Sequence, residues 1–272
     1  MVESDKELSV RVVQLTDTHL FRDPHAALLK LNTQDSFEKV MELVIQNERD
    51  IDVVLGTGDI AQDASREAYL RFAQAMQPLK APFYWVPGNH DRRQLMETLA
   101  PFEHAFTNLV TVGKWQIVLL DSSVAGQVHG YLQERELQHL ERTLRAVQQH
   151  PQVEHVLVCL HHNPVDGTAA WMSGIGLQNQ HEFLAIIERH ACVRAVLYGH
   201  IHQELDFERQ GVRFLCTPST CIQFKPRVQD FTLDEVNPAY RTLLLQPDGR
   251  IDTQVIRVTG HAFEVDHTST GY

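Results

Sequence analysis

The 272-residue sequence lacks several features that define common classes of protein. Its four cysteines do not show the repeated close pairing of a disulfide framework or a zinc site, although Cys216 and Cys221 leave a redox or metal pair as an alternative. No run of about 18 apolar residues predicts a membrane-spanning helix. Residues 1–13 lack the basic stretch and apolar core of a secretory leader. These absences predict a cytoplasmic protein with reduced thiols and no membrane partner.

Positive charge is also scarce. The chain has 24 lysines and arginines against 35 aspartates and glutamates, which gives a net charge of −11. Such a balance argues against a surface that binds nucleic acid or anionic lipid. What is abundant is histidine, with 16 residues, and histidine is the side chain most often used for metal binding and proton transfer near neutral pH.

Short aliphatic and β-branched segments alternate with segments of helical periodicity, which predicts an α/β fold. The predicted strands are 10–15, 53–55, 83–86, 115–120, 155–160 and 193–198, and antiparallel hairpins are predicted at 205–215 and 242–258. Apolar residues at helical spacing include Phe37, Val40, Met41, Val44 and Ile45. Because no repeat or flexible linker divides the chain, we predict a single domain over 1–272. It carries a loop excursion at 217–240 and a C-terminal hairpin and tail at 241–272.

Five predicted strands run directly into polar residues of one kind. The segments that follow them are Asp17-Thr18-His19, Gly58-Asp59, Gly88-Asn89-His90-Asp91, His161-His162-Asn163 and Gly199-His200-Ile201-His202. In an α/β sheet the loops after the carboxyl ends of the strands gather at one edge, where such folds bind their ligands. We therefore expect these side chains to lie together.

Imidazole combined with carboxylate and amide oxygens favours iron, manganese or zinc over calcium or a thiolate site. Each motif alone has a structural alternative, because a buried histidine is often a hydrogen-bonded core residue. The ordered set of five motifs, each after a predicted strand, indicates a metal site. The glycines at 58, 88 and 199 let the backbone turn where the ligands converge.

This ordered set resembles the signature of the calcineurin-like metallophosphoesterases. The segments TDTHLF, TGDIAQD, GHIHQELD and TPSTCIQFKP further resemble the bacterial class III 3′,5′-cyclic-AMP phosphodiesterases, and the resemblance extends from about residue 10 to the C-terminus. It implies a four-layer α-β-β-α sandwich with two mixed sheets and a dimetal site at the carboxyl ends of the strands.

The resemblance also implies a ligand set for two metal ions, with iron or manganese expected and zinc as the alternative. Asp17, His19 and His202 would hold the first ion; Asn89, His161 and His200 would hold the second; Asp59 would bridge them. Of the adjacent residues His161 and His162, the resemblance favours His161 as the ligand. A bridging hydroxide would attack phosphorus, since metal ions about 3.5–4 Å apart can clamp both ends of an in-line displacement.

The expected catalytic residues are His90, which would stabilise the charge of the transition state or protonate the leaving alkoxide, and Asp91, which would orient His90 or serve only as a turn residue. The predicted substrate contacts are His19, Asn89, His90, His202, Thr217, Ser219 and Phe224. The last three belong to the 217–240 excursion and would contact the nucleoside, unless that excursion only packs over the sheet.

The expected activity is hydrolysis of 3′,5′-cyclic AMP to 5′-AMP, with a small molecule as the partner and a homodimer as one oligomeric state. The alternatives are a general phosphodiesterase, a 2′,3′-cyclic nucleotide hydrolase, a pyrophosphatase of lipid precursors or a metal-free scaffold. The scaffold is disfavoured because every expected ligand is present.

Overall fold

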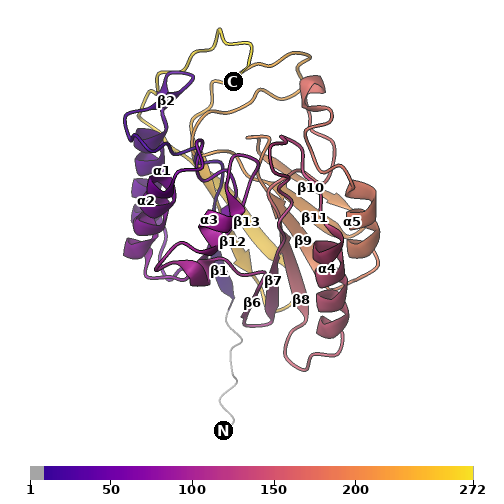
Figure 1. Cartoon of the computed structure of the whole chain (residues 1–272). Coiled ribbons are helices and arrows are strands. Elements are labelled where there is room, and N and C mark those ends of the chain that lie inside the picture. The colour runs from indigo at the N-terminus through magenta and orange to yellow at the C-terminus, as the bar shows by residue number, and fades with distance from the viewer. Residues whose placement is uncertain (1–8, 272) are drawn as a thin grey trace.

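The computed structural model describes residues 9–271, so the expectation about a leader falls partly on residues outside this range. Two β-sheets lie face to face, and helices cover the outer face of each sheet (Figure 1). The predicted α/β sandwich with two mixed sheets is therefore confirmed. Within the described residues, no helix is both long enough and apolar enough to cross a bilayer.

The first sheet has the strand order β13-β12-β1-β4-β5. Its members are β1 (Val10–Leu15), β4 (Val53–Thr57), β5 (Phe83–Val86), β12 (Ala239–Leu245) and β13 (Ile251–Arg257). Strands β1, β4 and β5 run parallel, whereas β12 pairs antiparallel with both β1 and β13. The predicted C-terminal hairpin thus completes the same sheet that begins the chain.

The second sheet has the order β10-β11-β9-β8-β7-β6. Its members are β6 (Leu109–Val112), β7 (Trp115–Leu119), β8 (His155–Cys159), β9 (Val193–Tyr198), β10 (Leu205–Arg209) and β11 (Val212–Cys216). The four central strands are parallel and the two edge strands are antiparallel. Two short strands, β2 (Ala27–Leu28) and β3 (Leu31–Asn32), form a separate ribbon.

The helices fill the outer layers. They are α1 (Thr33–Asn47), α2 (Arg66–Met76), α3 (Arg93–Glu97), α4 (Glu134–Val147) and α5 (Gln180–Ile187), with short 3₁₀ turns at Gln77–Leu79, Glu103–Ala105 and Ala170–Met172. Helices α1 and α2 pack on the first sheet, and α4 and α5 pack on the second (Figure 1). The side chains of Asn32 and Ser65 accept backbone N–H bonds at the starts of α1 and α2.

Three apolar clusters hold the layers together. Two of them each join one sheet to the helices that cover it. The third lies between the sheets, where Val12 and Leu55 pack in the same cluster as Leu157 and Leu197. Because the central strands are buried on both faces, they form continuous apolar segments instead of alternating ones. The carboxyl ends of the strands are thereby fixed by a core on each side.

Two predictions about local structure were wrong or incomplete. Ile45 is predicted on the apolar face of α1, but 44% of it is exposed, whereas the preceding residue Val44 is fully buried. Strand β6 was missed because it is short and only partly buried, so it carries no strong apolar signal; it pairs antiparallel with β7.

Candidate metal centre

The residues after five strands meet at one edge of the sandwich, as predicted. Asp17 and His19 follow β1, Asp59 follows β4, Asn89 follows β5, His161 follows β8, and His200 and His202 follow β9. Most of these side chains are buried, although Asn89 keeps some exposure. Residues distant in sequence are therefore brought together in one small volume.

One group of ligand atoms surrounds the first candidate position. The Nε2 atoms of His19 and His202 are 3.2 Å apart, and Asp17 Oδ1 lies 3.3 Å from His202 Nε2. Asp59 Oδ2 lies 3.8 Å from His19 Nε2. Donor atoms about 2.1 Å from one ion lie roughly 3 Å from each other in octahedral geometry, so these spacings fit a single cation.

A second group surrounds His161 Nε2. Asn89 Oδ1, His200 Nδ1 and Asp59 Oδ2 each lie 3.2 Å from this nitrogen. The Asp59 oxygen is the same one that faces His19 in the first group. A single carboxylate oxygen therefore lies between two clusters of donors, which is the arrangement needed to bridge two cations.

The outward nitrogens of the four histidines test whether these groups fit metal ions. Each outward nitrogen faces an oxygen atom that can only accept a hydrogen bond. The pairs are His19 Nδ1 with Gln62 Oε1, His161 Nδ1 with the Thr57 carbonyl, His202 Nδ1 with the Ile222 carbonyl, and His200 Nε2 with the Ile175 carbonyl. A carbonyl oxygen can only accept, so the outward nitrogen carries the proton. The inward nitrogen then offers a lone pair, as metal-ligating histidines do.

The electrostatics of the metal-free centre favour neutral His19 and His200 but a protonated His161, which must lose its inward proton before its Nε2 can bind a metal ion. Burial lowers the pKa of both His19 and His200 to about 3, so these imidazoles are neutral at neutral pH. Burial also opposes a charge on His161, but the adjacent Asp59 carboxylate outweighs it and raises the pKa of His161 to about 9. The same neighbouring imidazoles hold the pKa of Asp59 well below its usual range despite its burial. The pocket thus contains ionised carboxylates that a cation would neutralise.

The backbone is strained at these positions. Five of the seven predicted ligands have left-handed backbone angles, with φ of 53° at Asp17, 46° at His19, 48° at Asp59, 70° at His200 and 46° at His202. Such conformations cost roughly 1–3 kcal/mol for residues other than glycine, and they concentrate at functional sites. The fold therefore maintains an unfavourable local geometry that directs these side chains inward.

Two of the predicted glycines are needed for space instead of for a turn. A Cβ atom on Gly88 would collide with the Asp59 carboxylate, and one on Gly199 would collide with the Asp17 carboxylate. Gly58 fits the expectation of a sharp turn, since its φ is 93°. All three glycines let backbone and ligand side chains lie in contact.

The calcineurin-like phosphoesterase model matches residues 10–204, which include every candidate ligand. The chain belongs to the calcineurin-like phosphoesterase family. This family relationship agrees with the paired donor groups, and it explains why strands from both sheets contribute to one centre.

Curated relatives cover nearly the whole chain. The 3′,5′-cyclic adenosine monophosphate phosphodiesterase CpdA of Pseudomonas aeruginosa is 42% identical over 98% of this chain and 96% of its own length. The protein of the same name from Escherichia coli K12 is 41% identical with the same coverage. Among solved structures, a dimetal phosphatase from Danio rerio superposes with a TM-score of 0.63 at 17% identity, covering 92% of this chain and 99% of the other. That last likeness concerns the fold alone.

His90 lies beside this phosphoesterase centre and is only half buried. Its ring centroid is 5.0 Å from that of His19, and its backbone N–H donates to Asp59 Oδ1 over 2.8 Å. The side chain therefore faces the shared space while the main chain orients the bridging carboxylate. These two contacts are made by different parts of the residue.

Asp91 makes its hydrogen bonds to the backbone. Its carboxylate accepts N–H bonds from Gly88, Ile60 and Ala61 at 2.9, 3.2 and 3.0 Å. Burial and the nearby charge of Asp59 raise the pKa of Asp91 to about 6. The side chain thus ties the loop that carries Asn89 and His90 to the loop that carries Asp59.

Replacing Asp91 with alanine should lower the free energy of unfolding of the metal-free protein by about 3 kcal/mol, because three buried N–H groups would lose their acceptor. Urea denaturation measures this loss. Asp91→Asn keeps one acceptor oxygen and should lose less. A variant whose kcat falls while its stability is unchanged would show instead that Asp91 acts on His90.

Three of the predicted substrate contacts are buried inside the protein. The Thr217 hydroxyl donates to Gln14 and accepts from Arg241 Nε, and the Ser219 hydroxyl donates to the Asp17 carbonyl over 2.7 Å. The Phe224 ring stacks on His202 with centroids 4.3 Å apart. All three side chains are at most 1% exposed. Their surroundings correct the expectation of an open nucleoside surface, because they pack behind the metal ligands instead.

Sequence reasoning missed Gln62, and it named His162 and Cys221 without placing them at the centre. Gln62 orients His19, and nothing in a lone glutamine indicates that role. His162 lies within reach of His161 and His200, but its Nδ1 faces Ser122 Oγ at 2.8 Å. Cys221 lies near His19 and His202, whereas Cys216 is buried on β11; both are free thiols.

Proposed function

We propose that this phosphoesterase hydrolyses 3′,5′-cyclic AMP to 5′-AMP. The observation that carries the proposal is the 42% identity, over 98% of the chain, to a protein named as a 3′,5′-cyclic AMP phosphodiesterase. The geometry supports it, since every residue expected to act in the reaction except those of the 217–240 excursion lies at one centre.

In this proposal Asp17, His19 and His202 would hold one divalent ion, Asn89, His161 and His200 would hold the other, and Asp59 would be shared by both. When bound, two such ions supply positive charge for the phosphoryl oxygens and lower the pKa of a water nucleophile. The two carboxylates neutralise only part of that charge. The centre can therefore attract a phosphodiester anion although the whole protein carries a net charge of −11.

The chain's own residues complete the reaction. Water adds its oxygen to phosphorus, the bond from phosphorus to O3′ breaks, and O3′ takes a proton. We assign His90 to that last transfer, because its side chain is half buried and faces the ring of His19. Four of the predicted substrate contacts, His19, Asn89, His90 and His202, lie at the centre and would contact the phosphate.

Product analysis tests the proposal. The purified protein is supplied with Mn²⁺ or Fe²⁺ and offered 3′,5′-cAMP, 3′,5′-cGMP, 2′,3′-cAMP, bis-p-nitrophenyl phosphate and p-nitrophenyl phosphate in parallel. Conversion of 3′,5′-cAMP to 5′-AMP supports the assignment. Hydrolysis of the aryl esters without attack on 3′,5′-cAMP would contradict it and favour a general phosphodiesterase.

Iron or manganese is the proposed metal, because four imidazoles, two carboxylates and an amide form a donor set without thiolate; zinc is the alternative. Elemental analysis of protein purified without chelator tests this choice. We also propose a cytoplasmic location, which the four free cysteines support, and a homodimer as the oligomeric state. Cell fractionation and sedimentation velocity test these two points.

A further inference from the structure

A cavity of about 830 Å³ lies beside the candidate metal centre. Its wall includes Gly88 and Asn89, and Asn89 is also a member of the second donor group, 3.2 Å from His161 Nε2. Most of the remaining wall comes from residues 91–94 and from residues within 121–135, the segment after β7, and Ala64 completes it. Ligand pockets for small molecules have volumes of about 300–1,000 Å³, so this space can hold a nucleoside.

The two walls of the cavity are fixed relative to the centre. Arg93 pairs with Asp121 over 2.5 Å, and Asp121 also accepts from the backbone N–H and the hydroxyl of Ser123. On the opposite side, His162 joins the metal-ligand loop to the segment after β7 through Ser122 and the Val128 carbonyl. The cavity is therefore built by the same loops that build the centre.

Three exposed side chains in this cavity, those of Arg92, Gln94 and Gln133, have polar groups available for a ligand. Arg92 and Gln94 lie two and four positions after His90, on the loop that carries it. Among residues 9–271, no carboxylate forms an ion pair with the Arg92 guanidinium, and no hydrogen bond engages the Gln94 side-chain amide. The arginine beside them, Arg93, is already paired with Asp121.

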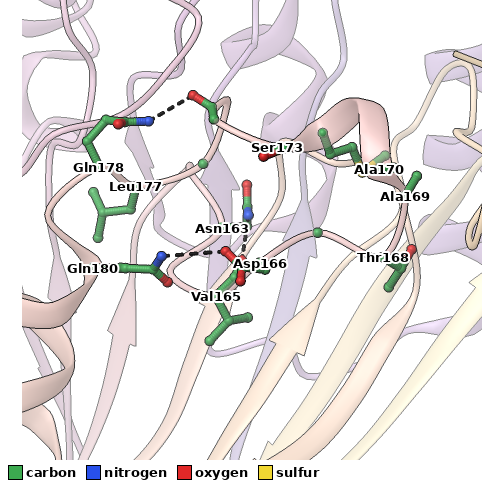
Figure 2. A pocket seen from close by; sticks show the side chains of 14 residues that line it. Asn163, Val165, Asp166, Thr168, Ala169, Ala170, Ser173, Leu177, Gln178 and Gln180 are labelled. Atoms are coloured by element: carbon green, nitrogen blue, oxygen red, sulfur yellow. Dashed lines mark hydrogen bonds between the residues drawn. The ribbon is translucent and has the colours of Figure 1, made fainter. Parts of the chain in front are cut away.

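A second cavity, of about 480 Å³, is lined by residues within 163–180 (Figure 2). The amide groups of three of its side chains donate within the same loop. Gln178 donates to the Gly174 carbonyl, Asn163 donates to the Val165 carbonyl, and Gln180 donates to Asp166, as Figure 2 shows. These three donors are therefore already engaged, in contrast to the Arg92 guanidinium and the Gln94 amide of the first cavity.

We propose that the nucleoside half of the substrate lies in the first cavity, with Arg92 against the face of the base and Gln94 at its edge. This inference rests on the proposed function. A planar guanidinium stacks on aromatic rings. A glutamine amide pairs with both N7 and the N6 amino group of adenine, whereas guanine presents two acceptors there. Gln94 would thus favour adenine over guanine.

The test compares kinetics on two diesters, 3′,5′-cAMP and methyl p-nitrophenyl phosphate, which has no nucleoside. Arg92→Ala and Gln94→Ala should each lower kcat/KM for 3′,5′-cAMP on the order of tenfold, mainly through KM, and leave the aryl ester unchanged. Gln94→Ala should also reduce the preference for 3′,5′-cAMP over 3′,5′-cGMP. Gln178→Ala in the second cavity is the matched control and should alter neither substrate.

The outcomes separate this inference from the proposed function. If the wild-type protein hydrolyses the aryl ester but not 3′,5′-cAMP, the proposed function fails. Suppose instead that the wild-type protein hydrolyses both substrates. If the Arg92 and Gln94 variants then keep full activity on both, or lose activity on both to the same extent, only the assignment of the nucleoside site fails. A loss confined to 3′,5′-cAMP in Gln178→Ala would move the nucleoside to the second cavity and overturn the assignment to the first.

Discussion

Replacing His90 with alanine should lower kcat for 3′,5′-cAMP by roughly 10²–10⁴-fold, the usual contribution of a general acid, without loss of metal. The structure gives the reason both for the loss of kcat and for the retention of metal. The imidazole faces the shared space, 5.0 Å from the His19 ring, whereas Asp59 is oriented by the His90 backbone N–H. Alanine keeps that N–H and removes only the ring.

Two measurements check this prediction. Elemental analysis of the His90→Ala protein should give the wild-type metal content. His19 and Asp59, whose ligand atoms lie within 4.8 Å of a His90 ring nitrogen, also belong to the two donor groups that would hold the ions without His90. The loss should also depend on the leaving group: the 3′ alkoxide needs a proton, whereas p-nitrophenolate leaves as an anion. Activity on methyl p-nitrophenyl phosphate should therefore fall less. Equal losses on both esters would assign His90 to stabilising charge on the phosphate, and loss of metal would make it a ligand.

The positions of the ligands could be predicted from the sequence because they depend on a simple rule of chain direction. Strands β1, β5 and β9 have the bounds that their aliphatic segments predicted, and the residues after each strand share one edge. Strand β6 was not predicted because its side chains are only partly buried. Strands that are fully buried can therefore be predicted from their apolar residues, whereas a partly buried strand cannot.

The groups that orient the ligands could not be predicted in the same way. Three of the four histidines are held by backbone carbonyls, those of Thr57, Ile222 and Ile175, and every residue type has a carbonyl. Such partners leave no signature in the sequence. The error about Thr217 and Ser219 has a related cause: their hydroxyls indicated polar contacts, but the contacts are with Gln14 and the Asp17 backbone.

Replacing Asp59 with asparagine should have the largest effect on the centre. Its Oδ2 atom faces both His19 and His161, so the change removes a negative charge from both donor groups at once. We expect weaker binding of both ions and a fall in activity of roughly 10³-fold or more, since a bound cation contributes several kcal/mol to phosphoryl transfer. Elemental analysis and kcat measure the two effects.

The Asp59→Asn variant should also change how the stability of the metal-free protein depends on pH, an effect that does not involve metal coordination. In the metal-free wild type, Asp59 raises the pKa of His161 to about 9, above the ordinary value of about 6.5. The folded protein therefore binds this proton more tightly than the unfolded chain. The resulting stability is full below about pH 6.5 and is lost as the pH rises through 9, by up to about 3 kcal/mol.

In Asp59→Asn the carboxylate that holds the proton is absent, so this loss of stability between pH 6.5 and 9 should largely disappear. Urea denaturation of the chelator-treated proteins across that range measures it, with His90→Ala as the control, because that variant keeps Asp59 and should retain the wild-type slope. Metal binding to the wild type must displace the same proton, so calorimetry in buffers of different ionisation enthalpy should detect proton release that Asp59→Asn lacks. Identical pH slopes in the two proteins would show that the Asp59–His161 pair does not hold a proton, and the protonation state assigned to the metal-free centre would then be wrong.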